Sequence, residues 1–429
     1  MKIRRIKADE HDLQQFLAAG AENMLAYEEQ VRAIGQEIKA RGDEAIFEYT
    51  RRFDGPVNET NMLVTEAEFD KAYEMVDDAY IYAIRNAIEN ITAFHNRQLK
   101  NSWMEPDERG VILGQLHRPL ERVGIYVPGG TAAYPSSVLM NAIPAQVAGV
   151  PQIAMVSPPD KLGKINPYTL VAAYELGLEE VYKMGGAQAI FALAWGSDRI
   201  RKVDLISGPG NIYVTLAKKM VYGDVNIDML AGPSEILIIA DDKADPVYVA
   251  ADLMSQAEHD VLARSIMVTP DATLPDRVEA ELGRQVASLS RHNMIVEALE
   301  NNGAFITTRD MEEACKVANL IAPEHLELMV EAPFDLLSKI HNAGAIFMGQ
   351  YTPEPVGDYF AGPNHILPTG GTARFYSPVT VDTFTKTSSI IYYSRQGIKE
   401  DADHIIKLAT VEGLTAHANA VRVRKGSDG

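Results

Sequence analysis

The sequence predicts an α/β fold with two Rossmann-like parallel-sheet domains side by side and helical arms at both ends of the chain. Three observations support this class. Short apolar runs alternate with helical segments in two separate stretches, glycine-rich turns follow several of these runs, and both ends of the chain have helical patterns. Alternating strands and helices are typical of parallel sheets, because each helix returns the chain to the edge where the next strand begins.

The composition fits a globular protein of two or three domains. The chain has 429 residues, of which 46% are hydrophobic and 23% charged, and no apolar stretch is long enough to span a bilayer. The first residues carry positive charge without the apolar segment of a secretory signal, so we expect a cytoplasmic protein. A net charge of -19 argues against nonspecific nucleic-acid binding and favours small molecules as partners.

The front of the chain is predicted to be helical scaffold. Residues 27–53 and 66–100 carry apolar side chains at spacings of three and four. From Arg122 the pattern changes to strands and helices, with strands expected at 123–127, 153–157, 181–184 and 203–207.

A second α/β stretch follows, with strands expected at 235–241, 265–269 and 304–308. The tail returns to a charged helical pattern and suggests an arm that packs on another subunit. We therefore expect an N-terminal helical arm at 1–22, a discontinuous first α/β domain at 23–121 and 235–378, a second Rossmann-like domain at 122–234, and a C-terminal helical arm at 379–429.

One helix carries a pair of residues with metal-ligand spacing. Asp245 is a plausible N-cap with Pro246 at the first helical position, and Gln256 and His259 follow three residues apart. Such a pair can bind a metal, but the solvated face of a helix is the simpler interpretation of this spacing alone. The single cysteine, Cys315, lies in a helical pattern with apolar neighbours, and we expect it to pack rather than to act as a nucleophile.

Other chemically suggestive residues lie near turns. Glu324 and His325 follow a helix and suit proton transfer, although an exposed polar turn has the same pattern. The Gly- and Pro-rich segment 355–378 is predicted to be a long ordered loop offering Asp358 and His365, and for His365 a local hydrogen bond is the favoured interpretation.

Two features of the sequence leave ligand binding open. Glu412 and His417 are five residues apart and would not share one face of an unbroken helix. Gly413 and Thr415 could break the helix between them. The Rossmann fingerprint GxGxxG is absent, so the turns PGGTAAYPSS, GGAQA and GPGN are weak evidence for a phosphate site. Spacing alone supports only a two-domain α/β enzyme with a possible His/Asp/Gln metal site.

The motifs together resemble those of the histidinol dehydrogenase family over most of the chain. IDMLAGPSEILIIADDKADPVYVAADLMSQAEHD, APEHLEL, VGDYFAGPNHILPTGGTARF and EGLTAHA occur in the order expected for the family. The resemblance implies a zinc-dependent homodimer with shared active sites, which oxidises L-histidinol through L-histidinal to L-histidine with two NAD⁺.

The resemblance also implies roles for individual residues. Glu324 and His325 would be the acid/base residues. The zinc ligands would be Gln256, His259, Asp358 and, from the partner subunit, His417. Substrate contacts would come from Ser234, Gln256, His259, His325, Asp358, Glu412 and His417, and dinucleotide contacts from Tyr126, Gln188 and Asn211.

Three rival functions make different predictions. A related zinc dehydrogenase would form NADH with another small alcohol but little with histidinol. A zinc hydrolase that activates water through Glu324 would turn over without NAD. A binding or assembly protein would carry these residues without using them, and the intact set of acid, base and metal positions argues against it.

Overall fold

The computed structural model describes residues 1–429 except 9–12, 14, 17–23, 130–132 and 427–429. Contacts divide the chain into two units. The first contains Met1–Gln98 and Leu120–Phe384, and the second contains Leu99–Pro119 and Thr385–Gly429. Among the described residues, no helix is both long enough and apolar enough to cross a membrane.

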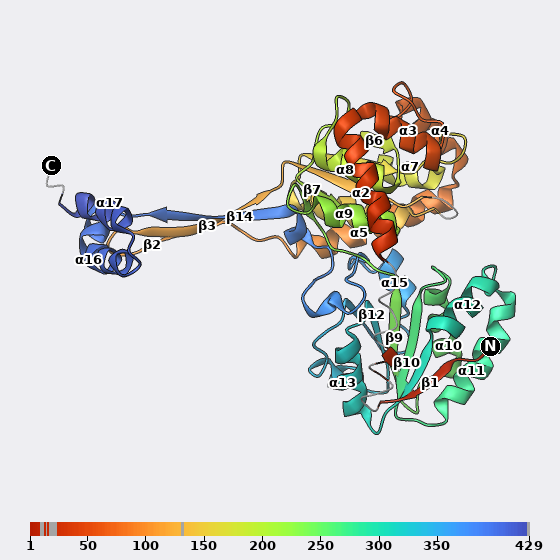
Figure 1. The fold of residues 1–429 in the computed structure, drawn as a ribbon. Helices are drawn as coiled ribbons and strands as arrows, with labels where there is room; N and C mark the ends of the chain where they lie inside the picture. Colours follow the sequence, from red (N-terminus) through yellow and green to blue (C-terminus); the bar gives the residue numbers. More distant parts are fainter. Residues whose placement is uncertain (9–12, 14, 17–23, 130–132, 427–429) are drawn as a thin grey trace. The chain divides into compact units, whose positions relative to one another are not determined.

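The first unit contains a five-stranded parallel sheet with the strand order β6-β5-β4-β7-β8 (Figure 1). Its strands are β4 (Arg122–Tyr126), β5 (Gln152–Ser157), β6 (Glu180–Lys183), β7 (Leu205–Ser207) and β8 (Asn226–Ile227). The chain adds β5 and β6 on one side of β4 and then β7 and β8 on the other. This reversal is the switch point of a doubly wound fold, so the predicted Rossmann-like sheet is confirmed.

Helices cover both faces of this sheet. One buried cluster combines α4 and α5 with α6 and α7, and another combines α2 and α3 with α8 and α9. These helices are α2 (Met24–Arg41), α3 (Asp43–Phe53), α4 (Glu66–Met75), α5 (Asp78–Asn96), α6 (Pro135–Ala148), α7 (Pro167–Glu175), α8 (Gly186–Trp195) and α9 (Ile212–Val221). The expected grouping of residues 23–121 with 235–378 is therefore wrong for α2 to α5, because periodicity reveals an apolar helix face but not the surface it packs on.

A six-stranded parallel sheet has the order β1-β11-β10-β9-β12-β13. Its strands are β1 (Arg4–Lys7), β9 (Glu235–Ala240), β10 (Arg264–Thr269), β11 (Ala304–Thr307), β12 (His325–Met329) and β13 (Ala345–Met348). Helices α10 (Pro246–Ala257), α11 (Leu274–Gln285) and α12 (His292–Asn302) pack on one face, and α13 (Met311–Ile321) and α14 (Phe334–Leu337) on the other. Cys315 is buried on α13, which confirms its packing role.

The N-terminal segment differs from the expected helical arm. Arg4–Lys7 form β1, which pairs in parallel with β11 and buries Ile6. Only one of these four residues is buried, so the alternation that identifies a strand is hardly visible in the sequence. Residues 9–12, 14 and 17–23 of the predicted arm lie outside the described residues.

The second unit contains an antiparallel sheet of β14 (Thr385–Tyr392), β3 (Ile112–Pro119) and β2 (Trp103–Pro106), followed by helices α16 (Arg395–Val411) and α17 (Thr415–Lys425). The expected all-helical tail is thus wrong for β14, and residues 99–119 are not part of the first α/β domain. The strand was not predicted because β14 begins with polar residues, although it pairs with β3 over its full length. The predicted break at Gly413 is confirmed, because its φ of 75° separates α16 from α17.

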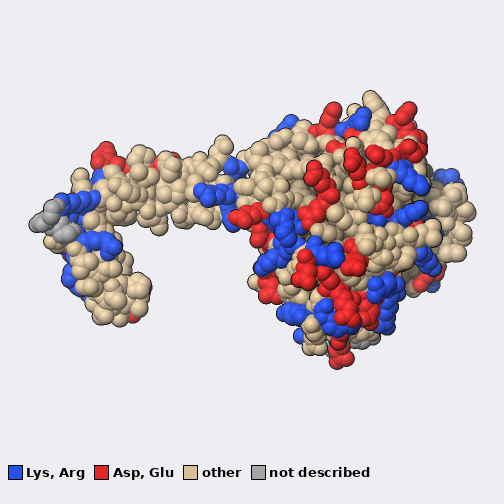
Figure 2. Space-filling model, turned by 90° about the horizontal axis from the view of Figure 1, so that it is seen from above, with Lys and Arg blue, Asp and Glu red and all other residues tan. Residues whose placement is uncertain are grey.

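The surfaces of the two units differ in composition. Acidic and basic side chains are interspersed on the face of the first unit seen in Figure 2, whereas long stretches of the second unit carry neither. Large apolar side chains exposed on the second unit include Trp103, Met104, Leu113, Ile391, Tyr392, Leu408, Val411, Leu414 and Val423. An exposed apolar set of this size is typical of a surface that binds another protein.

Candidate functional site

The predicted dinucleotide residues lie at the carboxyl edge of the five-stranded sheet. Tyr126 ends β4, Gln188 is in the first turn of α8 after β6, and Asn211 is the N-cap of α9 after β7. The Asn211 side chain accepts hydrogen bonds from the backbone of Tyr213 (3.1 Å) and Val214 (3.2 Å). Loops at the carboxyl ends of β4 and β7, where the sheet order reverses, are where doubly wound folds bind ligands.

Asp54, which the sequence interpretation missed, connects two of these positions. Its Oδ2 accepts hydrogen bonds from Gly185 N (2.9 Å) and Gln188 Nε2 (3.0 Å), while Gly186 N donates to the Tyr126 hydroxyl (3.1 Å). Burial raises the pKa of Asp54 to about 6, although the two hydrogen bonds that it accepts lower this pKa. Tyr126 and Gln188 are thus part of one hydrogen-bonded group, and only the fold brings Asp54 to it.

The GPGN turn after β7 lies directly against the end of β4. Gly208 has a φ of 124°, and a Cβ there would lie 2.1 Å from the Tyr126 carbonyl oxygen, so only glycine fits. Asp228 accepts from Gly208 N (2.7 Å), and Lys218 donates to Gly208 O (2.9 Å). Asp228 and Lys218 also form a buried ion pair with each other, so both partners of Gly208 are held in place.

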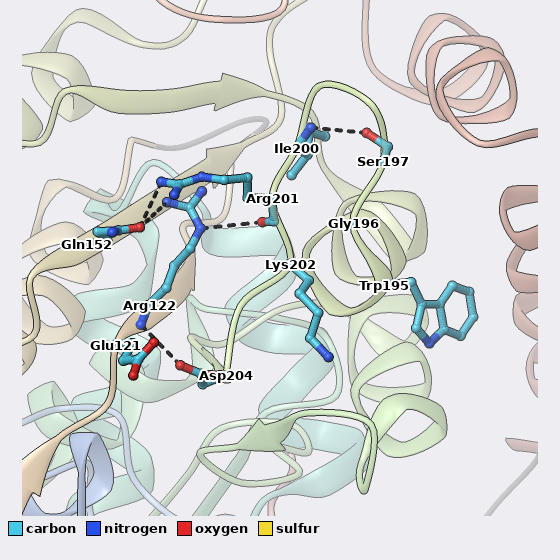
Figure 3. Close-up of a pocket in the computed structure, with 10 residues that line it drawn as sticks. All are labelled: Glu121, Arg122, Gln152, Trp195, Gly196, Ser197, Ile200, Arg201, Lys202 and Asp204. Carbon is cyan, nitrogen blue, oxygen red and sulfur yellow. Dashed lines mark hydrogen bonds between the residues drawn. The ribbon is translucent and has the colours of Figure 1, made fainter.

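The opposite, amino edge of the same sheet carries a pocket of about 660 Å³ (Figure 3). Arg122, Gln152 and Asp204, at or next to the beginnings of three strands, line it. Its polar groups bond to one another or to neighbours: Arg122 pairs with Glu180, and Gln152 Oε1 accepts from Arg201 Nη2 at 2.7 Å. The pocket contains none of the predicted site residues.

The predicted metal pair lies at the amino edge of the six-stranded sheet. Asp245 caps α10 by accepting from Val247 N (2.9 Å), with Pro246 at the first position, as predicted. The helix ends at Ala257, so His259 lies in the turn beyond it and not on the helix. Gln256 is 0% exposed, which excludes the interpretation of a solvated face for this residue, whereas His259 is exposed.

His325 begins the buried strand β12 and Glu324 immediately precedes it, and both residues are buried rather than in an exposed turn. Glu324 Oε2 accepts from Glu235 N (2.9 Å), and His325 Nδ1 lies 3.1 Å from Glu235 O, to which it donates. The other ring nitrogen, Nε2, has no hydrogen-bond partner and lies 3.7 Å from Asp358 Oδ1 and 3.8 Å from Glu354 Oε1. The backbone of β9 therefore fixes the ring and leaves Nε2 facing the candidate metal residues.

Asp358 is on a short helix within the segment that was predicted to be a loop. Helix α15 (Glu354–Tyr359) places Glu354 and Asp358 four residues apart on one face, and Glu327 Oε1 accepts from Glu354 N at 2.9 Å. One ligand atom from each of His259, Glu354 and Asp358 lies within 4.8 Å of the others. Sequence reasoning missed Glu354, whose only local signal is its spacing from Asp358.

His365 makes the local hydrogen bond that was favoured for it. Its Nδ1 donates to the backbone oxygen of Asp358 at 3.1 Å. The segment after α15 continues without regular structure, except for a 3-10 turn, η2 (Thr372–Arg374), and reaches another, η3 (Val381–Phe384), before β14. A third such turn, η1 (Val286–Ser288), follows α11.

The site is rich in carboxylates, and Glu324, His325 and Glu354 are buried, whereas His259 is exposed. Burial raises the pKa of Glu324 to about 8 and that of Glu354 to about 7. Burial lowers the pKa of His325, but Glu354, Glu324 and Asp358 outweigh it and hold that pKa well above its usual value. Conversely, burial raises the pKa of Asp358, and contact with His325 lowers it below its usual range.

This donor set fits a divalent cation. Carboxylate, imidazole and amide groups without thiolate suit Zn²⁺, with Mn²⁺ or Co²⁺ as substitutes. The unpartnered, buried Nε2 of His325 and the carboxylates facing it are groups whose burial is costly unless a positive charge balances them.

The remaining predicted residues are placed separately. Ser234 precedes β9, is half-buried, and accepts from Arg264 N through its backbone oxygen (3.0 Å). Glu412, the C-cap of α16, and His417, on α17, belong to the second unit, where both are exposed. Their part in the site stays a prediction.

Comparisons with known proteins assign the chain to a family. The family model described as histidinol dehydrogenase matches residues 18–425. A histidinol dehydrogenase of Heliobacterium mobile is 60% identical and covers 92% of this chain and 93% of its own length, and one of Geobacter metallireducens is 51% identical over 100% and 99%. The crystal structure of histidinol dehydrogenase from Elizabethkingia anophelis matches with a TM-score of 0.93 and 38% identity over 98% of both chains. The chain therefore belongs to the histidinol dehydrogenase family of oxidoreductases.

Proposed function

We propose that the chain oxidises L-histidinol through L-histidinal to L-histidine, with zinc and two NAD⁺. One observation carries the proposal: the fold brings His259 and Asp358 together in one cluster of possible metal ligands, with Asp358 next to the open nitrogen of His325 and the Gln256 amide next to the same ring. Membership of the histidinol dehydrogenase family supports this substrate. A cytoplasmic location is part of the same proposal and rests on the sequence.

The residues that would hold the metal are Gln256, His259, Asp358 and His417 of the partner subunit. When bound, zinc would orient the amino alcohol through the substrate nitrogens, and NAD would accept the hydrides. The apolar side chains exposed on the second unit support a homodimer, in which the partner's Glu412 would contact the substrate.

His325 is proposed as the base that accepts the hydroxyl proton in both oxidations. Its Nδ1 is held by Glu235 O, so the proton is accepted at Nε2, which faces Asp358. The surrounding carboxylates raise the pKa of His325, and a cation that neutralises them favours the neutral imidazole that a base requires.

Glu324 is proposed to activate the water that attacks the bound aldehyde. It lies 3.7 Å from His325 Nδ1 and accepts a hydrogen bond from Glu235 N, which fixes its carboxylate. A pKa raised toward neutrality by burial is what a general base needs near physiological pH. Ser234, adjacent to Glu235, is the proposed substrate contact on this strand.

Tyr126, Gln188 and Asn211 are proposed to contact the dinucleotide. Tyr126 and Asn211 follow β4 and β7 at the switch point of the five-stranded sheet, and Gln188 follows β6 at the same carboxyl edge, which supports this role. The N-termini of α8 and α9, which carry Gln188 and Asn211, add backbone N–H groups suited to a pyrophosphate.

The decisive experiment follows NADH formation with L-histidinol before and after removal of divalent ions by a chelator. We expect two NADH for each histidine formed, loss of activity on chelation, and recovery with Zn²⁺. NADH formation with another small alcohol but little with histidinol would select the related dehydrogenase. Turnover that is independent of NAD would select the hydrolase.

A further inference from the structure

We infer that Asp54 selects NAD over NADP by accepting a hydrogen bond from the 2′-hydroxyl of the adenosine ribose. This inference rests on the proposed dinucleotide site and adds a residue that the family resemblance did not assign. Asp54 is the C-cap of α3, and its carboxylate bonds to the beginning of α8, which carries the proposed dinucleotide contact Gln188.

The two oxygens of the Asp54 carboxylate have different surroundings. Oδ2 accepts both hydrogen bonds, from Gly185 N (2.9 Å) and Gln188 Nε2 (3.0 Å). Oδ1 accepts none from the residues that the structure describes, and Asp54 is half-buried, so this oxygen is open to a ligand. An ionised carboxylate oxygen is only an acceptor, so a ligand that bonds to it must offer a donor such as a hydroxyl.

Asp54 replaces an acidic residue that many NAD-binding folds carry elsewhere. In doubly wound folds, an acidic residue of the first strand-helix-strand unit binds the ribose 2′-hydroxyl of NAD. In this sheet the unit is β4, α6 and β5, and β5 ends at Ser157. The next acidic residue, Asp160, is engaged by its own turn, because its Oδ1 accepts from Leu162 N (2.8 Å) and Lys164 N (2.9 Å).

The fold brings Asp54 to this same turn. A Cβ at Gly55 would lie 2.2 Å from the backbone oxygen of Asp160, so the backbone next to Asp54 packs directly on the turn after β5. The turn after β6 packs there too, since a Cβ at Gly185 would lie 2.5 Å from the Cβ of Pro158. Asp54 therefore supplies a carboxylate from α3 at the carboxyl ends of β5 and β6, where the unit itself offers none.

The electrostatic surroundings of Asp54 favour a hydroxyl over a phosphate. Its pKa is raised by burial and lowered only by its two hydrogen bonds, without a contribution from any lysine or arginine of the described chain. A phosphate next to this carboxylate would be repelled, and no nearby cation offsets the repulsion. Sites that accept the 2′-phosphate of NADP have an arginine nearby instead. The site should therefore bind NAD and exclude NADP.

The test measures the affinity of the full-length protein for NADH and NADPH by calorimetric titration at pH 8, where Asp54, with a pKa of about 6, is ionised. The variant Asp54→Asn keeps an oxygen for Gly185 and Gln188 but removes the charge. The control Asp70→Asn removes an exposed carboxylate on α4 of the same unit. We expect the ratio of NADH to NADPH affinity to fall by about tenfold or more in Asp54→Asn and to stay unchanged in the control.

An analogue of NADH that lacks the adenosine 2′-hydroxyl separates a direct contact from a structural effect. Loss of this hydroxyl should weaken binding to wild type by about tenfold, the value of a hydrogen bond to a charged group. In Asp54→Ala, which has no acceptor, its loss should have no further effect. If Asp54→Ala does not fold, the affinity ratio of Asp54→Asn decides.

Two results would overturn the assignment of Asp54 while leaving the proposed reaction intact. One is an unchanged affinity ratio in Asp54→Asn, and the other is an equal loss of affinity for all three dinucleotides, which would mean that Asp54 acts only by holding Gln188. A wild-type protein that binds none of the three would overturn the NAD-dependent reaction as well.

Discussion

The ring of His325 is fixed at one nitrogen and open at the other. Glu235 O holds Nδ1, and Nε2 faces Asp358 and Glu354 without a hydrogen-bond partner. If Nε2 accepts the substrate proton, His325→Ala removes the base and leaves the proposed zinc ligands intact. We expect oxidation to fall by about 10²- to 10⁴-fold with zinc content unchanged.

Zinc content by atomic absorption and NADH formation with histidinol are the two measurements for this variant. His341→Ala, which changes an exposed histidine of the same unit, is the matched control and should behave as wild type. Retention of wild-type turnover by His325→Ala would refute the proposed role of this side chain as the base.

Asp54 gives a pH-dependent prediction. Its pKa is about 6 in the folded protein and near 3.8 when unfolded, so the folded state binds its proton more tightly. The folded state is therefore favoured at low pH, and this advantage is lost as the pH rises from about 4 to above 6. In the Asp54→Asn variant, the amide oxygen can still accept from Gly185 and Gln188, and the side chain never becomes charged.

We therefore expect the Tm of Asp54→Asn relative to wild type to increase between pH 4 and pH 7. Thermal unfolding of both proteins across this range checks the prediction, and the comparison at each pH removes contributions from other titrating groups. A constant Tm difference would mean that the carboxyl of Asp54 is not destabilised by burial.

At the scale of single elements, α10 shows how separate parts of one helix have separate roles. Asp245 caps its N-terminus, while Gln256 in its last turn and His259 beyond it are proposed metal ligands. Asp245→Ala should cost about 0.5–2 kcal/mol of stability by removing the cap, and leave zinc affinity unchanged.

Calorimetric unfolding and chelator competition test these two parts of the α10 prediction. Asp242→Ala removes an exposed carboxylate just outside the helix and should have little effect on either measurement. A large loss of zinc affinity in Asp245→Ala would show that the cap also positions Gln256.

Elements with continuous apolar character were predictable from the sequence, whereas two elements that carry proposed site residues were not predicted. The strands β4, β5, β9 and β10 were expected close to their observed bounds. β12 was missed because its sequence HLELM places His325 and Glu327 inside a buried strand, where Glu235 O and Glu354 N bond to them. α15 was missed because prolines flank Glu354, although a proline within the first turn is compatible with a helix.

At the scale of the whole molecule, the two parallel sheets repeat one strand order but carry their proposed sites at different edges. The dinucleotide positions lie at the carboxyl edge of the five-stranded sheet, where the general rule for such folds expects them. The metal candidates lie at the amino edge of the six-stranded sheet. The cause is that α10 runs antiparallel to the strands of this sheet. Its last turn, which carries Gln256, therefore lies near the first residues of β9 and β12.

This arrangement limits what sequence spacing can reveal about the site. Gln256, His259, Glu324 and Asp358 span about 100 positions, and only the folded sheet brings them together. Local spacing therefore supported only a possible metal pair, and the resemblance supplied the ligand set. Glu354 required the structure, since neither spacing nor the motifs identified it.

The proposed contribution of the partner's His417 makes a prediction about mixed dimers. His259→Asn and His417→Asn should each be inactive alone. A mixed dimer contains one His259→Asn subunit and one His417→Asn subunit. If His417 acts on the opposite subunit, one site of this dimer contains both substitutions and the other site contains neither. Random assembly of equal amounts makes half of the dimers mixed, so co-expression should restore about one quarter of wild-type activity. If His417 acts within its own subunit, every site in the mixture carries one substitution, and NADH formation stays at the level of the single variants.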